Sequence, residues 1–269
     1  MADIQPKTKP FYWVHIILIV LTLQSCTMVK VSVSDQRNPI PQTLKLNEIL
    51  TITTWGAIKV NTSDFFPSSF QIVCNGHVSY IDPVEVDPSE KADVIYITHA
   101  HPDHYSPSTI ANLAKPETQF ICAKGVAKKL LKQGYNVTAV VPGDVIELNG
   151  THIEAVPAYN TKTVFLWFKA HPKSKQNVGF ILDFGQGLRL YHAGDTDAIP
   201  EMNKIRDISV ALVPIGGDNL TMNIDEAAQI VNGIQPEQVI PMHYELGNKA
   251  DLTKFKTLVE DGIKVTTLD

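Results

Sequence analysis

Cysteine is scarce in this sequence, and motifs of nucleophilic catalysis are missing. The 269 residues include three cysteines and no Cys-x-x-Cys pair, which argues against a cysteine-based metal site. Cys74 and Cys122 lie in apolar stretches and are predicted to be buried core residues, with a disulfide between them as the alternative. No Gly-x-Ser-x-Gly stretch signals a serine hydrolase. The formal net charge is −5 and no Lys/Arg run forms a basic stripe, so we expect no nucleic-acid partner.

A long apolar run occurs near the N-terminus. Lys7 and Lys9 precede the apolar residues 11–23, a run that is short for a membrane span. The letters LQSC follow, ending at Cys26, and they resemble a bacterial lipobox. We therefore predict that residues 1–26 are a lipoprotein-type signal. Lipidated Cys26 would anchor the protein to a bacterial membrane in the cell envelope, outside the cytoplasm. An uncleaved membrane anchor and a plain signal peptide are the alternatives.

The segment that follows the signal is polar. Residues 27–47 are broken by Pro39 and Pro41, which predicts a tether. Residues 48–269 then show no repeat and no second boundary, which predicts one domain.

Short β-type runs and helical patterns alternate along that domain, twice over. Asn75-Gly76 separates two such runs and predicts a hairpin. Further β-type runs include residues 49–55, 93–98, 144–148, 151–156, 164–168, 178–184 and 188–194. Helical patterns occur at 106–114, 124–133, 223–233 and 250–260. Two sheets that face each other, with helices outside, would bury all of these apolar faces, so we predict an α/β fold of that kind.

The residues ITHAHPDHYSP, 97–107, form the most distinctive local motif. His99 and His101 follow an apolar strand and lie two apart, so in extended backbone they face the same side. Pro102 breaks the strand, and Asp103 and His104 turn back toward the same point. Imidazole and carboxylate are ligands that Zn²⁺ and similar ions take. Four ligands are too many for one tetrahedral ion with an open position, so the motif favours a pair of metals.

Two distant residues share this strand-end setting. Asp195 follows an apolar strand and a glycine in YHAGDTD, and His243 follows another in VIPMHYE. With HxHxDH, the later GD[ST] carboxylate and the C-terminal histidine resemble the metallo-β-lactamase superfamily. The stretches THAHPDH, YHAGDTD, TMNIDEAA and IPMHY are similar to its metal-dependent hydrolases related to ascorbate-6-phosphate lactonase. The resemblance to the phospholipase D that acts on N-acyl-phosphatidylethanolamine is more distant.

The resemblance covers about residues 48–269 and implies a four-layer αββα sandwich with its site at one edge. It implies two ions, with zinc expected and Mn²⁺ or Fe²⁺ as alternatives. The first ion would be held by His99 and His101. The second would be held by the remaining motif residues and the C-terminal histidine, and one carboxylate would bridge both: Asp103, His104, His243 and Asp195.

The resemblance suggests further residues behind the ligands. Asp82 matches the carboxylate that orients a metal-binding histidine, and a turn residue is the alternative. His192 is a weaker candidate for the same role, and a structural role is favoured. Gly216 and Gly217 either approach a substrate or make a turn.

The sequence departs from the family pattern at one ligand. Where a third histidine for the first metal is expected, the stretch VPAYNT carries Asn160. An amide binds zinc more weakly than imidazole does. Either Asn160 binds directly, or the first site is weak, or His171 in the lysine-rich stretch KAHPKSK substitutes for the missing histidine.

These residues predict a hydrolase in which a metal-activated hydroxide cleaves an ester-type bond, such as a lactone or phosphodiester, of a small molecule or lipid. Asp195 and Asp103 are the candidate catalytic carboxylates, and Asp103 could pass a proton to the leaving group. Two other functions stay open. Asn160 allows a non-catalytic metal-binding protein with a degenerate site, and the ligand set also allows a di-iron redox protein.

Overall fold

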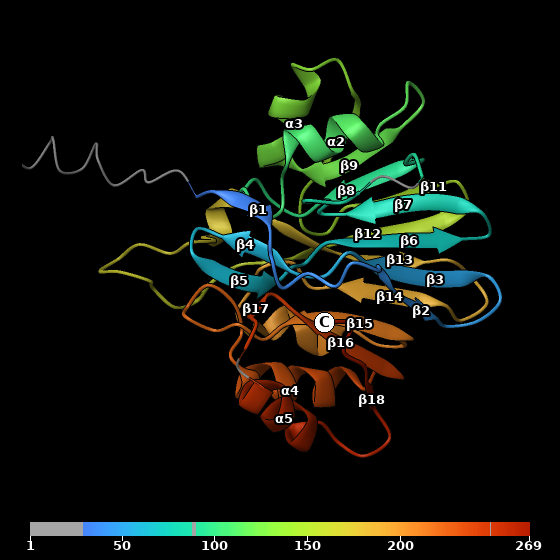
Figure 1. Cartoon of the computed structure of the whole chain (residues 1–269). Helices are drawn as coiled ribbons and strands as arrows, with labels where there is room; N and C mark the ends of the chain where they lie inside the picture. The colour runs from blue at the N-terminus through green and yellow to red at the C-terminus, as the bar shows by residue number, and fades with distance from the viewer. Residues whose placement is uncertain (1–28, 88–89, 248) are drawn as a thin grey trace, which may run out of the picture.

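A computed structural model describes residues 29–87, 90–247 and 249–269, and in it two seven-stranded sheets stack face to face (Figure 1). Helices α2 and α3 cover the outer face of the first sheet, and α4 and α5 cover the outer face of the second (Figure 1). This is the predicted αββα sandwich. The predicted signal and Cys26 lie outside the described residues. Among the helices that are described, none has the length and apolarity to cross a membrane.

The first sheet has the strand order β10-β9-β8-β7-β6-β3-β2. Its strands from β7 to β10 run parallel, and the others pair antiparallel. Their bounds are β2 Gln42–Lys45, β3 Leu50–Thr54, β6 Phe70–Cys74, β7 His77–Ile81, β8 Val94–Ile97, β9 Gln119–Ala123 and β10 Asn136–Val140. The covering helices are α2 Pro107–Leu113 and α3 Lys124–Leu131.

The second sheet has the order β11-β12-β13-β14-β15-β16-β18, with β14, β15, β16 and β18 parallel. Its strands are β11 Val145–Leu148, β12 Thr151–Pro157, β13 Val178–Asp183, β14 Arg189–His192, β15 Val210–Pro214, β16 Gln238–Met242 and β18 Lys264–Val265. Helices α4 Ile224–Ile234 and α5 Lys249–Leu258 pack outside it, and the 3-10 turns η1 Lys173–Lys175 and η2 Pro200–Lys204 lie in its loops. A small third sheet joins β1 Val31–Val33, β4 Ile58–Val60, β5 Ser63–Phe66 and β17 Tyr244–Glu245.

Strand β8 shows why the strand before the histidine motif is apolar throughout. Ile95 and Ile97 pack in the cluster under α2 and α3, whereas Val94 and Tyr96 pack in the core between the sheets. The Tyr96 ring lies 5.4 Å from that of Phe180 on the facing sheet. A parallel strand that is covered on both faces needs apolar side chains at every position.

Several local predictions are confirmed. Asn75 and Gly76 join β6 to β7 and both have positive φ, 50° and 78°, as a tight two-residue hairpin turn requires. Cys74 and Cys122 are free and buried, so the disulfide alternative is wrong.

The predicted tether is partly wrong. Within residues 27–47, β1 pairs with β4, and β2 pairs with β3 at the edge of the first sheet. Leu44 packs against the main core, while both prolines lie between the two strands. A short alternating run suffices for an edge strand, so the folded unit begins before residue 48.

Residues 164–168 do not form the predicted strand. Strand β12 pairs directly with β13, with Pro157 opposite Val178, so the sheet has no vacant position for a strand between them. The segment instead makes a projecting turn, in which Val164 N donates to Phe168 O at 2.8 Å. All five side chains are exposed.

Candidate metal centre

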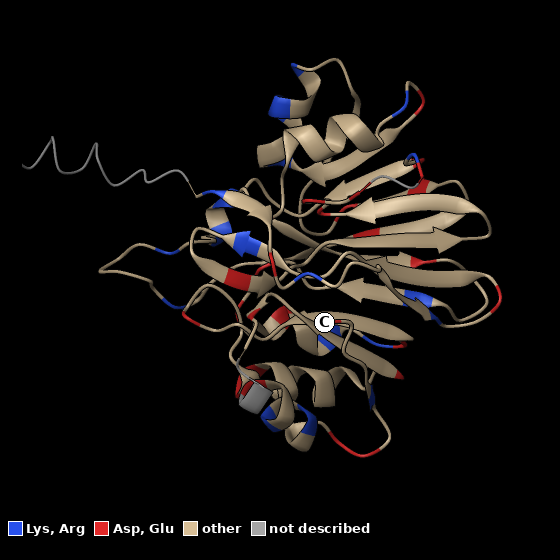
Figure 2. Ribbon diagram, in the orientation of Figure 1, with Lys and Arg blue, Asp and Glu red and all other residues tan. Residues whose placement is uncertain are grey.

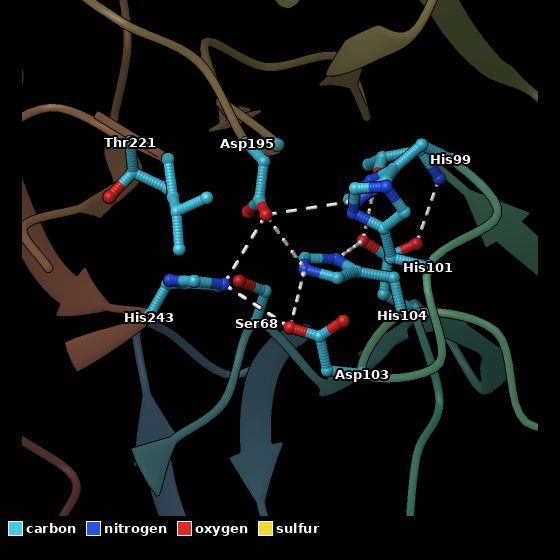
Figure 3. Close-up of polar contacts among 12 residues, drawn as sticks. Ser68, His99, His101, Asp103, His104, Asp195, Thr221 and His243 are labelled. Carbon is cyan, nitrogen blue, oxygen red and sulfur yellow. Dashed lines mark hydrogen bonds and ion pairs between the residues drawn. The ribbon is translucent and has the colours of Figure 1, made fainter. Parts of the chain in front are cut away.

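The predicted ligands meet at one edge of the sandwich, where parallel strands of both sheets end (Figure 3). The histidine motif follows β8 of the first sheet. Asp195 follows β14 and His243 follows β16, both in the second sheet. A further histidine, His171, comes from the long loop between β12 and β13. Carboxyl ends of neighbouring parallel strands bring such side chains together although they are far apart in the sequence.

One ligand group comprises His99, His101, His171 and Asp195, whose ligand atoms all lie within 4.8 Å of one another. Asp195 Oδ2 is 3.7 Å from His99 Nε2 and 3.5 Å from His171 Nε2. His171 Nε2 is 3.0 Å from His101 Nδ1. Of the two candidates for the missing ligand, the geometry therefore places His171 in the group.

The other ligand group comprises Asp103, His104, His243 and again Asp195. Asp195 Oδ2 is 3.2 Å from His104 Nε2 and 3.3 Å from His243 Nε2 (Figure 3). Asp103 Oδ2 lies 3.4 Å from His243 Nε2 and 3.7 Å from His104 Nε2. One carboxylate is thus common to both groups.

The atoms at the centre fit divalent cations. His99 Nε2, His104 Nε2 and Asp195 Oδ1 are buried and make no hydrogen bond. Unsatisfied buried polar atoms are costly. Both imidazole nitrogens also lie at ion-pair distance from the other oxygen of Asp195, Oδ2, at 3.7 and 3.2 Å. Imidazole nitrogens and carboxylate oxygens are the donor set that zinc and related ions take, so the residues suit a pair of cations.

Asp82 lies directly behind the ligands and is fully buried. Its Oδ2 accepts a hydrogen bond from His104 Nδ1 at 2.7 Å and another from Thr98 Oγ1 at 2.6 Å. Its Oδ1 accepts from Thr98 N at 2.8 Å. Because Nδ1 of His104 donates to this carboxylate, Nε2 is the nitrogen left to face the centre.

Thr98 links Asp82 by hydrogen bonds to a second histidine, His99. The only hydroxyl proton of Thr98 goes to Asp82, so Thr98 Oγ1 accepts from His99 Nδ1 at 3.0 Å. That bond leaves the lone pair of His99 Nε2 for a ligand. Thr98 was not predicted from the sequence, although a threonine directly before the first motif histidine was the available signal.

Asn160 supports the substitute histidine. Its Oδ1 accepts from His171 N at 2.8 Å and from His171 Nδ1 at 2.9 Å. Its Nδ2 donates to Leu220 O at 2.9 Å and Asp197 Oδ1 at 3.2 Å. The Asn160 amide therefore orients the His171 ring, and it acts on the centre through that ring.

His192 makes no hydrogen bond to a predicted ligand. Its Nε2 donates to Ser68 O at 3.0 Å, and its Nδ1 accepts from Gly194 N at 3.2 Å. The second bond steadies the turn that precedes Asp195. This geometry matches the structural role that the sequence favoured.

The histidines of the two groups differ in charge preference. Burial lowers the pKa of His99 well below its usual value and that of His171 to about 4. Burial also lowers the pKa of His101. Burial acts the same way on His104 and His243, but their neighbouring carboxylates outweigh it. The pKa of His104 is raised well above its usual value, and that of His243 is raised to about 10.

The two carboxylates of the centre stay ionised. Burial opposes the charged form of Asp103, but His104 and His243 hold its pKa down at about 2. The same two histidines lower the pKa of Asp195 well below its usual value despite burial. Negative charge for binding cations is therefore present at neutral pH.

Gly216 allows the close backbone approach that positions His243. A Cβ atom at Gly216 would lie 2.3 Å from His243 O. His243 itself has a φ of 51°, which side-chain-bearing residues rarely adopt. Gly216 thus packs against the backbone of the ligand segment, whereas Gly217, with a φ of 75°, faces Asn223.

Comparisons with known proteins show which proteins this chain resembles. The model of the beta-lactamase superfamily domain matches residues 65–243. A UPF0173 metal-dependent hydrolase of Thermoplasma acidophilum is 31% identical over 202 residues, which cover 70% of this chain and 86% of that protein. A second one, from Nanoarchaeum equitans, is 34% identical over 197 residues, covering 70% and 87%.

Solved structures that resemble this chain include proteins of the same kind. A Parabacteroides distasonis protein assigned as a metal-dependent hydrolase superposes with a TM-score of 0.67 at 31% identity, covering 85% of this chain and 98% of that one. A metallo hydrolase of Ignicoccus hospitalis superposes at 0.61 and 29% identity, covering 76% and 93%. A diiron β-hydroxylase of Streptomyces venezuelae, at 0.53 and 16% identity over 69% and 46%, shares the fold.

Proposed function

Because the chain belongs to the metallo-β-lactamase superfamily and is a metal-dependent hydrolase, we propose that it holds two divalent cations and cleaves an ester-type bond. The bond would be a lactone, phosphodiester or related linkage of a small molecule or lipid. Zinc is the proposed metal, with Mn²⁺ or Fe²⁺ as alternatives. One observation carries the proposal: the buried carboxylate of Asp195 is common to two complete ligand groups.

Each ion has a defined set of residues. The first would be held by His99, His101 and His171, and the second by Asp103, His104 and His243, with Asp195 shared by both. Divalent ions at paired sites supply Lewis acidity and make a water molecule nucleophilic near neutral pH.

The two carboxylates differ in accessibility, which divides their proposed roles. Asp195 is 3% exposed and lies within 3.7 Å of four histidine nitrogens, so it fixes the two groups relative to each other. The side chain of Asp103 is 18% exposed and is ionised at neutral pH. Asp103 is therefore the carboxylate that can accept a proton and return it to a leaving group.

The alternative of a degenerate site depended on Asn160. That alternative loses its main support, because His171 completes the first ligand group and Asn160 orients it. The redox alternative has no independent support, since the likeness to the diiron β-hydroxylase concerns the fold alone.

The experiment is a hydrolysis screen of the purified full chain, loaded with Zn²⁺, Mn²⁺ or Fe²⁺, against lactone, phosphodiester and thioester reporters. We expect turnover of at least one class, lost on chelation and restored by metal. His77→Ala is the matched control, because His77 is an exposed histidine outside both groups. A metal-loaded protein that turns over no reporter, or a coloured iron protein that consumes oxygen, would contradict the proposal.

We also propose that lipidated Cys26 holds the domain at a bacterial membrane outside the cytoplasm. The support is the sequence alone: two lysines, a short apolar run and the letters LQSC. Expression with a fatty-acid probe tests it. Label that disappears in Cys26→Ala supports the anchor, and an unlabelled wild-type protein that still begins at Met1 contradicts it.

A further inference from the structure

Residues 164–168, the sequence VFLWF, form an apolar tip that projects from the body of the molecule. In Figure 1 this loop extends past β4 and β5, well beyond the layers of the sandwich. All five side chains are exposed, with Phe165 at 71% and Trp167 at 84%. The other large exposed apolar side chains in the described chain occur singly, such as Ile40, Leu131 and Val145. Single exposed apolar residues are ordinary, but five in succession indicate a binding surface.

Hydrogen bonds and an ion pair hold the base of this loop in place. Asp197 Oδ2 accepts from Thr161 N at 2.7 Å and from Lys162 N at 2.9 Å. Asn219 Nδ2 donates to Thr163 O at 3.1 Å. Lys162 also forms an ion pair with Glu226 at the start of α4. The chain therefore holds the apolar tip out toward its surroundings on a fixed base.

Hydrogen bonds within the tip satisfy some of its own backbone N–H and C=O groups. Val164 N donates to Phe168 O, and Phe168 N donates to Phe165 O, each at 2.8 Å. A turn that closes on itself can enter an apolar medium with fewer unsatisfied backbone groups than an extended segment can.

The chemistry of the tip matches a lipid surface. Its side chains are two phenylalanines, a tryptophan, a leucine and a valine, the residue types that interfacial segments bury. Lys162 and Lys169 flank it, and Figure 2 shows positive charge on both sides of the uncharged tip. Because Lys162 is paired with Glu226, Lys169 is the flanking cation that complements anionic headgroups.

We infer that residues 164–168 insert into the interface of an anionic membrane. Phe168 is three residues from His171, a member of the first ligand group, so insertion would place the metal centre close to the lipid surface. This contact is separate from the proposed N-terminal anchor, and it does not depend on the proposed hydrolysis.

Trp167 gives the test a local probe. The full chain contains three tryptophans: Trp55 is buried, and Trp13 lies in the N-terminal apolar run. In full-length Trp13→Phe protein, the exposed Trp167 reports on the loop even if the N-terminus is membrane-bound. The protein is mixed with vesicles of phosphatidylcholine and phosphatidylglycerol, with and without brominated acyl chains.

Insertion predicts a blue shift of Trp167 emission and strong quenching by bromines placed within about 5–10 Å of the headgroup boundary. Replacing Phe165 and Leu166 by serine should raise the lipid concentration for half-maximal quenching roughly tenfold or more. Vesicles without phosphatidylglycerol should require about fivefold more lipid for each lysine that reaches the headgroups. Leu131→Ser, a change at a distant exposed leucine, should have no effect.

Two results would overturn the inference. If brominated lipid does not quench Trp167 emission, the tip stays in water. A blue shift that grows with protein concentration in the absence of vesicles means that the tip binds a second copy of the chain. Metal content and thermal unfolding of each variant, measured in parallel, show that the domain stays folded.

Discussion

Asn160 and His171 are joined by three hydrogen bonds: Asn160 Oδ1 accepts from both the backbone N and the ring Nδ1 of His171, and Asn160 N donates to His171 O. The position that departs from the family pattern is thus coupled to His171, the residue proposed to take over its role. The amide fixes which ring nitrogen faces the centre, so a substitution at Asn160 should act on metal binding through His171.

Asn160→Ala should therefore weaken binding of the first metal about 10- to 100-fold. It should also lower the free energy of unfolding by about 1–3 kcal/mol, because it leaves buried polar partners unpaired. Competition with a chelator measures the affinity. Asn232→Ala, which removes an exposed amide contact to Leu258 O, is the control and should leave metal affinity unchanged. Unchanged affinity in Asn160→Ala would show that His171 needs no such support.

Thr98 can be tested by two substitutions of similar size. Thr98→Val removes the hydroxyl that links Asp82 to His99, and should reduce metal affinity at the first site about 10- to 100-fold. Thr98→Ser keeps the hydroxyl and should restore most of the affinity. Equal losses in the two variants would assign the effect to packing.

Removal of Asp103 or His243, two of the three proposed ligands that belong to the second group alone, should abolish hydrolysis. Asp103→Ala and His243→Ala should each lower turnover on an identified reporter by at least about 100-fold, with one metal lost and the domain still folded. The site lies at the edge of the sheets, so circular dichroism should be unchanged. Wild-type turnover in either variant would remove that residue from the mechanism.

The two sites should respond differently to pH. In the metal-free protein the raised pKa values of His104 and His243 keep them protonated at neutral pH, whereas His99, His101 and His171 are neutral. A metal entering the second site must displace protons, and each displaced proton weakens binding about tenfold per unit of falling pH. Acidification from about pH 8 to 6 should therefore empty the second site first.

Calorimetry in buffers of different ionisation enthalpy should detect proton release on binding of the second ion. Release on binding of the first ion alone would contradict this order.

Gly216→Ala should displace the His243 backbone, because the added Cβ would lie 2.3 Å from His243 O. We expect loss of the second metal and a fall in activity comparable to that of His243→Ala. Gly125→Ala is the matched control, since that helical glycine has open space around it. The control should be neutral or stabilising by about 0.5–1 kcal/mol. A fully active Gly216→Ala protein would show that the backbone yields without consequence.

The parts of the site that could be predicted are those encoded locally. The spacing of His99, His101, Asp103 and His104 after an apolar strand is visible in the sequence, and strand ends place Asp195 and His243 by topology. His171 stayed one of several alternatives because its position depends on the path of a long loop. Thr98 was missed because its hydroxyl matters only through a contact to Asp82, which lies on a different segment, and through the bond from His99 that this contact leaves possible.

The errors in the fold have similar causes. Residues 164–168 have β-type side chains, but apolar and aromatic residues suit a sheet and an exposed apolar tip equally well by composition. Residues 31–33 and 42–45 are strands whose pairing depends on edges supplied by β4 and β3, and such short edge strands carry little signal of their own.

The most direct measurement is the metal content of the full-length protein after saturation with zinc and removal of free ions, compared with His171→Ala. The shared carboxylate and the two ligand groups predict two zinc ions per chain in the wild type. In His171→Ala the first site should be weakened, so about one ion per chain should remain. One ion or none in the saturated wild type, or two firmly held ions in His171→Ala, would contradict the account.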